Sequence, residues 1–97
     1  MRQTNDQTLK EALYAFLNTN EKVKNKLFLA KINDFWQSKM GASITRYTTN
    51  VELKKHTLYF TITSAPLRHE LSFSKEKIKE MMNEMLGESF VEEVVIR

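Results

Sequence analysis

The fold class is decided by residues 44–63, which read ITRYTTNVELKKHTLYFTIT. Apolar and polar side chains alternate here with a period of two, and β-branched and aromatic residues are frequent, which is the pattern of half-buried strands. We therefore predict strands at 44–54 and 57–63. In the first strand the alternation puts one set of residues on one face and a second set on the other: Tyr47, Thr49, Val51 and Leu53, and Arg46, Thr48, Asn50 and Glu52. In the second strand the two sets are Leu58, Phe60 and Ile62, and Tyr59, Thr61 and Thr63. The link Lys54-Lys55-His56-Thr57 predicts an antiparallel hairpin, and because it lacks Asn-Gly we expect a four-residue loop.

Upstream of the hairpin the period of the apolar residues changes to that of helices. A first helix is predicted over 6–18, started by a cap at Asn5 or Asp6 and ended by Asn18-Thr19-Asn20. A second is predicted over 21–40, with Gly41 as its stop. The apolar stripes are Leu9, Ala12, Leu13, Phe16 and Leu17 in the first helix and Phe28, Leu29, Ile32, Phe35, Trp36 and Met40 in the second.

Downstream of the hairpin the sequence returns to helix. Ser64 is a good N-cap and Pro66 is tolerated in a first turn, so a short helix starts there. Ser74 is positioned to cap a second helix that runs to Gly87, and residues 90–96 read as a final strand. The apolar stripes of these two helices are Leu67 and Leu71, then Ile78, Met81, Met82, Met85 and Leu86.

The order of these elements predicts an α+β fold. After the first helix the order is α-β-β-α-α-β. The simplest two-layer fold with this order is a three-stranded sheet with helices on one face. The same order is the type II layout of KH-like nucleic-acid-binding domains. We expect residues 1–97 to form a single domain, with an N-terminal helix at about 6–20 and a KH-like core at 21–97.

The composition excludes several classes of protein. With 97 residues, 41% of them apolar, the chain can build one modest core, and with no cysteine it has no disulfide scaffold and no thiolate site. His56 and His69 lack the spacing of a zinc-binding helix, and Gly-rich phosphate loops and nucleophile elbows are absent from the sequence. We expect no enzymatic activity, metal, cofactor or small-molecule substrate. Long apolar runs and a signal peptide are missing too, so we expect a cytoplasmic protein with no membrane association.

The charge is unevenly distributed along the chain. The net charge of +3 divides into −1 over residues 1–21, +8 over 22–79 and −4 over 80–97. A basic middle segment suggests an anionic partner such as a nucleic acid, although charge that serves solubility is an equally simple explanation.

The last helix begins with lysines and ends with glutamates, which is opposite to what the helix dipole favours. Lys75, Lys77 and Lys79, with Arg68 on the preceding helix, are therefore candidate phosphate-binding residues; the alternative is an ordinary solvated face. KH domains carry G-x-x-G at this junction, whereas this chain has Ser72-Phe73-Ser74-Lys75. Close approach of the backbone to a nucleic acid is therefore not expected, but non-specific phosphate contact is.

Lys54 and Lys55 at the hairpin tip form a second candidate nucleic-acid-binding spot. Arg46 and Tyr59 are predicted on the non-core face of the sheet, where they could stack a base or fill a pocket on a protein partner. An ordinary exposed hairpin is the alternative. Trp36 and the methionines of the last helix are interpreted first as core residues, with base stacking and a flexible partner groove as the respective alternatives.

Several of these residues together resemble the DciA family. They are Phe35-Trp36, Met40-Gly41-Ala42 and Ile44, then Leu53 to Phe60 with Ile62 and Ser64, Leu67-Arg68-His69-Glu70-Leu71, Met85-Leu86-Gly87 and Val94-Val95-Ile96. The resemblance covers about residues 9–96, as a short, single-domain member. It implies a KH-like domain that binds the bacterial replicative helicase of the DnaB type, assists its loading and contacts DNA. The family usually has glycine at the position of His56 and often tryptophan at that of Leu67.

The leading hypothesis is therefore a non-enzymatic replication accessory module. It would contact a DnaB-type replicative helicase and the phosphates of single- or double-stranded DNA without reading sequence. A KH-like RNA-binding module and a protein adaptor without nucleic-acid binding are the two alternatives. The candidate residues rest on charge placement and not on the family resemblance.

Overall fold

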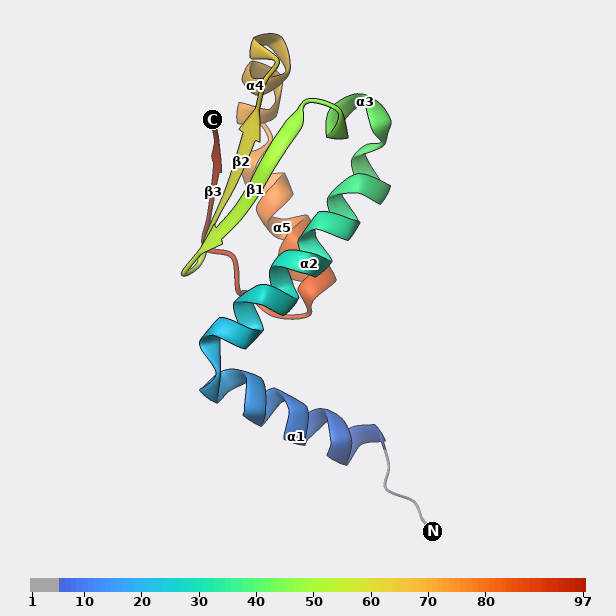
Figure 1. The fold of residues 1–97 in the computed structure, drawn as a ribbon, viewed down its shortest axis with the longest axis vertical. Coiled ribbons are helices and arrows are strands. Elements are labelled where there is room, and N and C mark those ends of the chain that lie inside the picture. The colour runs from blue at the N-terminus through green and yellow to red at the C-terminus, as the bar shows by residue number, and fades with distance from the viewer. Residues whose placement is uncertain (1–5) are drawn as a thin grey trace.

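The elements of a computed structural model, which describes residues 6–97, confirm the α+β prediction. Their order is α1 (Asp6–Thr19), α2 (Glu21–Met40), α3 (Ala42–Thr45), β1 (Thr48–Lys54), β2 (Thr57–Ile62), α4 (Ala65–Ser72), α5 (Lys75–Leu86) and β3 (Glu93–Ile96) (Figure 1). Gly41 with a φ of 80° ends α2 and left-handed Gly87 ends α5, as predicted. The proposed cap at Asn5 lies outside the described residues.

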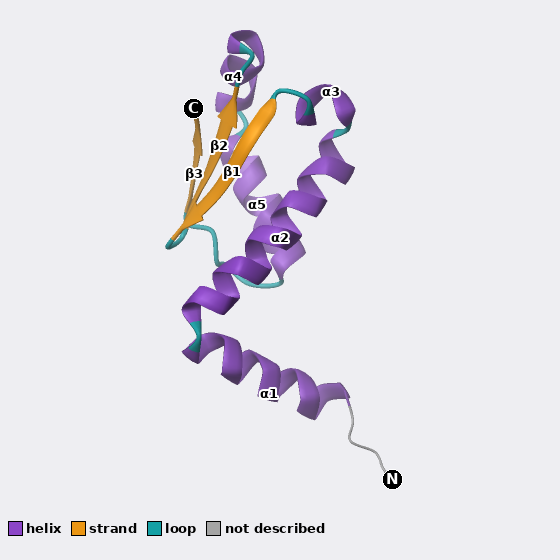
Figure 2. Ribbon diagram, viewed as in Figure 1, coloured by secondary structure: helices purple, strands orange, loops and turns teal. Residues whose placement is uncertain are grey.

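The sheet has the strand order β1-β2-β3 (Figure 2). β1 and β2 pair antiparallel, as predicted, and β3 runs parallel to β2 with Leu58 opposite Val94. The predicted four-residue loop is wrong: Lys54 pairs with Thr57, which leaves a two-residue turn. Lys55 makes this turn possible by adopting a φ of 56°, a conformation that glycine or asparagine usually supplies.

The predicted strand at 44–54 begins later than expected. Residues 42–45 form the one-turn helix α3, and Arg46 follows it in a turn, so the placement of Arg46 on the sheet face is wrong. A register irregularity between Thr48 and Asn50 shifts the alternation. It turns Thr48 to the core side, where its Oγ1 accepts a hydrogen bond of 3.0 Å from Trp36 Nε1. This tertiary contact overrides the local period of two.

The predicted strand at 90–96 is shortened to 93–96 for a similar reason. Asn83 on α5 holds Val91 at both its backbone groups: Nδ2 donates to the Val91 carbonyl at 2.9 Å, and Oδ1 accepts from the Val91 amide at 2.8 Å. These bonds use the backbone groups that a strand would offer to its neighbour. Phe90 and Val91 are buried as loop residues instead.

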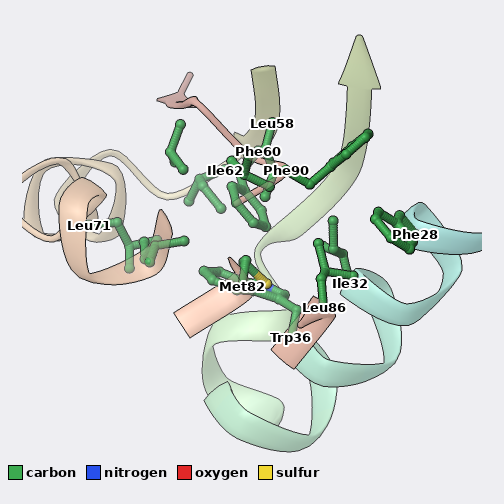
Figure 3. Close-up of a cluster of buried hydrophobic side chains, with 13 residues drawn as sticks. Phe28, Ile32, Trp36, Leu58, Phe60, Ile62, Leu71, Met82, Leu86 and Phe90 are labelled. Carbon is green, nitrogen blue, oxygen red and sulfur yellow. The ribbon is translucent and has the colours of Figure 1, made fainter. Parts of the chain in front are cut away.

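The core lies between the inner face of the sheet and the helices α2 and α5 (Figures 2 and 3). Trp36 packs against Phe60 with 4.2 Å between ring centroids, and Met82 is fully buried beside them. This confirms the interpretation of Trp36 as a core residue. Met81 and Met85 are only partly buried against the cluster.

Helix α1 projects away from this two-layer body (Figure 1). Leu17 near its end is buried, whereas Leu9, Leu13 and Phe16 of the predicted stripe are exposed. The described part of the chain is accordingly elongated, with extents of 56 × 24 × 20 Å.

Candidate nucleic-acid and partner surfaces

The outer face of the sheet carries a cluster of polar and charged side chains around Tyr59. Alternation along β2 places Tyr59 on this face, opposite Glu52 of β1. Arg97 stacks over the Tyr59 ring with its guanidinium carbon 4.6 Å from the ring centroid, and Lys54 Nζ lies 5.8 Å from the same centroid. Tyr59 is thus flanked by two cations, which is a geometry that favours cation–π attraction.

The carboxylate of Glu52 contacts the other polar side chains of this cluster. Its carboxylate accepts a hydrogen bond of 3.0 Å from Asn50 Nδ2 and lies 3.7 Å from Lys54 Nζ and 3.4 Å from Arg97 Nη2. The Asn50 hydrogen bond, followed by the charge of Lys54 and then that of Arg97, lowers the pKa of Glu52 below its usual value. The ionised carboxylate orients both cations over the sheet face and neutralises one of them.

The hairpin tip is fastened to the loop before β3. The ring Nδ1 of His56 lies 2.9 Å from the Phe90 carbonyl, and the His56 carbonyl accepts from the Glu92 amide at 2.8 Å. Lys55 stays exposed at the tip. Beside it, a hollow of about 370 Å³ lies between the tip and the start of α2; its lining includes Lys24, Lys55, His56 and Phe90. His56 therefore anchors the hairpin, and the side chain of Lys55 projects into solvent at the tip.

Arg68, one of the candidate phosphate-binding residues, is engaged in the fold. Its guanidinium Nη1 donates a hydrogen bond of 2.6 Å to the carbonyl of Ile62, the last residue of β2. The side chain is half-buried there. Ser64 caps α4 as predicted by accepting from the Leu67 amide, whereas within the described chain Ser74 makes no side-chain cap for α5. Arg68 thus fixes α4 to the sheet and offers only part of its charge to a ligand.

The three lysines of α5 are divided between two sides of the helix. Positions two apart in an α-helix are separated by about 200°, whereas positions four apart share a side. Lys75 and Lys79 therefore lie on one side, and Lys79 is 3.4 Å from Glu76. Lys77 lies on the other side, in a shallow hollow that it shares with Glu80, Met81 and Glu84.

The two candidate basic regions lie at opposite ends of β2. Lys54 and Lys55 adjoin Thr57 at its start, and Arg68 binds Ile62 at its end. These ends are about 17 Å apart at about 3.3 Å per strand residue. This arrangement separates the candidate lysines and Arg68 into a hairpin group and an α4–α5 group. Arg46 lies in the turn before β1.

Among residues 6–97 no cluster of three or more His, Asp or Glu side chains is arranged to hold a metal ion. Within the same range no helix has the length and apolar character needed to cross a membrane.

A comparison with protein-family models shows which family the chain resembles. The model described as "Dna[CI] antecedent, DciA" matches residues 8–96. The chain belongs to the DciA family. Membership in this family implies a role of the DnaB helicase-loader type in replication. No curated protein and no solved structure matches the chain.

The DciA match extends from α1 to β3 and so includes the Tyr59 face, the hairpin tip and the α4–α5 junction. Sequence reasoning missed three residues of this DciA chain. Arg97 reaches Tyr59 only because β3 runs parallel to β2, which the sequence does not reveal. Lys24 is buried against Glu88. Phe73, 76% exposed at the α4–α5 turn and paired with the His69 ring, was open to detection as a large apolar residue between two serines.

Proposed function

We propose that this chain is a replication accessory module that binds a DnaB-type helicase and contacts DNA phosphates without reading sequence. Family membership supports the helicase part of the proposal. The DNA part is supported by one observation above the others: Tyr59 on the uncovered face of the sheet, flanked by Lys54 and Arg97. The two cations are suited to the phosphates of single-stranded DNA, and a base can stack on the Tyr59 ring when the Arg97 guanidinium moves from the ring to a phosphate.

The KH-like order of the core is consistent with this use of the scaffold. Helix α2 is followed by the one-turn α3, the β1–β2 hairpin, the α4–α5 pair and β3. KH domains clamp the backbone with a Gly-rich loop between the two helices, and here that junction is Ser72-Phe73-Ser74. The proposal therefore assigns the main contact to the sheet face and the hairpin tip, through Lys54, Lys55, Tyr59 and Arg97.

The lysines of α5 form a secondary contact in the proposal. Lys75 and Lys79 share one side of the helix near its start, where the backbone amides favour anions. Lys77 is expected to contribute less, because Glu80 and Glu84 line the same hollow. Arg68 is expected to contribute mainly through its bond to β2.

The DNA part is tested by titrating a labelled single-stranded oligonucleotide with the protein at several salt concentrations. Each lost phosphate contact reduces the slope of log affinity against log salt by about 0.7 for single strands. The double variant K54A/K55A is expected to lower the slope by about 1.4. The matched control K22A/K39A removes two exposed lysines from α2 and is expected to leave the slope unchanged.

Tyr59 is tested separately from the charges. Y59A is expected to weaken binding by about 1–3 kcal/mol, whereas Y59F, which keeps the ring, is expected to bind like the wild type. Equal binding by Y59A and the wild type would reject the stacking role. A clear preference for RNA over DNA of the same length would favour the RNA-binding alternative. Helicase binding that withstands charge reversal of all these lysines, without any DNA binding, would favour the adaptor.

A further inference from the structure

Three separate parts of the chain meet around the hollow beside the hairpin tip. They are the junction of α1 and α2, the tip itself and the loop before β3, which lie at the same end of the sheet (Figure 1). With about 370 Å³, the hollow lies at the lower end of the range for small-molecule pockets, which is about 300–1,000 Å³. It therefore has room for one small planar group but not for a helix of a partner protein.

Hydrogen-bonding groups that are free within the described chain line this hollow. The side-chain amide of Asn25 has no partner among the described residues, and the Asn18 amide uses only its oxygen, which accepts from Lys24 Nζ. The ring of His56 lies with its Nδ1 2.9 Å from the Phe90 carbonyl. Because a carbonyl only accepts, Nδ1 carries the proton, and Nε2 of the neutral ring is left as an acceptor. The lining residues thus offer both donors and acceptors to a ligand.

Lys24 adds a buried donor to the same lining. It is 8% exposed, and its Nζ donates to Asn18 Oδ1 at 3.1 Å and to Glu88 Oε2 at 2.9 Å. An ammonium group has three N–H bonds, and the third has no oxygen or nitrogen acceptor among the described residues. Since buried donors in proteins are nearly always hydrogen-bonded, an acceptor on a ligand would complete this site.

The charges around the hollow are balanced, which disfavours a simple anion as the ligand. Lys24 is paired with Glu88, and Glu21 lines the same hollow as Lys55. A phosphate ion or a carboxylate in the hollow would approach acids as well as cations, and like charges that are brought together oppose binding. The lining therefore favours a neutral group that carries its own donors and acceptors.

We propose that the hollow binds one nucleobase. Nucleobases are neutral and planar, they carry donors and acceptors on their edges, and they stack on aromatic side chains, histidine included. The rings of His56 and Phe90, with centroids 4.7 Å apart, supply the aromatic wall, and Asn25 and Lys24 supply hydrogen bonds. A side-chain amide is both donor and acceptor, and so is the Watson–Crick edge of every base. The hollow therefore holds a base without selecting one.

This inference rests on the proposed DNA contact, because the hollow adjoins that surface. Lys54 lies beside the Tyr59 ring, and Lys55, the next residue, lines the hollow. Tyr59 is two residues beyond Thr57 at the start of β2, or about 7 Å along the strand. A single strand of DNA with one base on Tyr59 can therefore place a phosphate at the two lysines and a neighbouring base in the hollow.

The first test follows the side-chain amide signals of the full, ¹⁵N-labelled chain by NMR. Each of the four deoxynucleoside monophosphates is added up to about 10 mM, a concentration that reveals dissociation constants in the millimolar range. We expect the signals of Asn25 and Asn18 to shift with the nucleotides but not with deoxyribose 5-phosphate, which lacks the base. The Asn33 amide, which donates to the Leu29 carbonyl within α2, is the internal reference and is expected not to shift.

The second test titrates a labelled single-stranded oligonucleotide with the variant Asn25→Ala. We expect affinity to fall about 3–10-fold, the range for one lost hydrogen bond. The slope of log affinity against log salt is expected to stay unchanged, because Asn25 carries no charge. This separates Asn25 from Lys55, whose loss lowers the slope. The matched control Asn33→Ala removes the same side chain from α2 outside the hollow and is expected to bind like the wild type.

The outcomes separate this inference from the proposed function. If no nucleotide shifts the Asn25 and Asn18 signals, or if deoxyribose 5-phosphate shifts them equally, the base site is overturned. If Asn25→Ala binds the oligonucleotide like the wild type, the base of a DNA strand does not occupy the hollow, and the sheet-face contact stands without it. If the wild type binds no single-stranded DNA while nucleotides still shift Asn25, the proposed DNA contact fails and the hollow is a site for free nucleotides.

Discussion

The ion pair between Lys24 and Glu88 connects the junction of α1 and α2 to the core. Substitutions of Lys24 and of Glu88 are expected to change the free energy of unfolding by different amounts. Lys24 Nζ lies 2.9 Å from Glu88 Oε2 and between the rings of Phe28 and Phe90, 5.4 and 5.3 Å from their centroids. The side chain of Lys24 is 9% exposed and that of Glu88 is 33% exposed. Lys24 is therefore the member that depends on its partner, because its charge is largely removed from water.

Glu88→Gln leaves the Lys24 ammonium buried without a counter-charge. Breaking a fully buried pair in this way costs about 3–5 kcal/mol. Because Glu88 keeps part of its hydration and the new amide oxygen still accepts a hydrogen bond, we expect a loss of about 1–2 kcal/mol. For a domain of this size, such a loss lowers the Tm by about 5–15 °C. Lys24→Met places a flexible apolar chain between the two rings and removes the buried charge, so its cost is expected to be below about 1 kcal/mol.

The free energy of unfolding is to be measured in urea, with Trp36 fluorescence as the reporter of the core. Glu92→Gln, which changes an exposed acid in the same loop, serves as the control and is expected to be neutral. If Lys24→Met proved more destabilising than Glu88→Gln, the pair itself would be a net source of stability. The argument from desolvation would then be refuted.

Three further predictions concern the hairpin and the sheet. Lys55→Gly is expected to raise stability by about 1 kcal/mol, because glycine adopts the positive φ of this turn without strain; no gain in urea unfolding would argue against that strain. Glu52, whose pKa is lowered first by the Asn50 hydrogen bond, contributes stability that is present above its unfolded pKa of about 4.3 and is lost as the pH falls through the lower folded value. A carboxyl titration by NMR checks this, and an Asn50→Ala variant that left the Glu52 midpoint unchanged would contradict it. Thr48→Val is expected to cost about 1–3 kcal/mol in thermal unfolding, because it leaves the buried indole N–H of Trp36 without its acceptor; a neutral result would mean that the indole finds another acceptor.

The parts of the fold that the sequence predicted well are those decided by local periodicity and punctuation. The apolar stripe and Gly41 predicted α2 with its observed bounds, and the alternation at 57–63 predicted β2. The irregularity near Thr48 was missed because it accompanies the bond to Trp36, a contact between distant elements, and α3 was missed because residues 44 and 45 fit the alternation of the strand that follows. The hairpin loop was predicted too long because lysine rarely adopts the φ seen at Lys55.

The candidate site was predicted less completely than the fold. Tyr59 was placed on the outer face of the sheet, because alternation along a strand determines this, whereas Lys54 was assigned to the hairpin loop and Arg46 was placed beside Tyr59 instead. Arg97 was missed, because its stacking on Tyr59 depends on the parallel register of β3 beside β2. The division of Lys75 and Lys79 from Lys77 was open to prediction from helical spacing alone. The exposure of the apolar stripe of α1 could not be predicted from the sequence. Such a stripe predicts that one side of a helix is buried, but it does not identify what covers that side.

The most direct test of the account is whether the chain binds the DnaB-type replicative helicase of its own organism. Size-exclusion chromatography with light scattering, at low micromolar concentration of both proteins, measures the complex and its stoichiometry. We predict a co-eluting complex that persists in K54A/K55A, since those lysines are assigned to DNA. Absence of a complex, with both proteins folded, would contradict the helicase-accessory function.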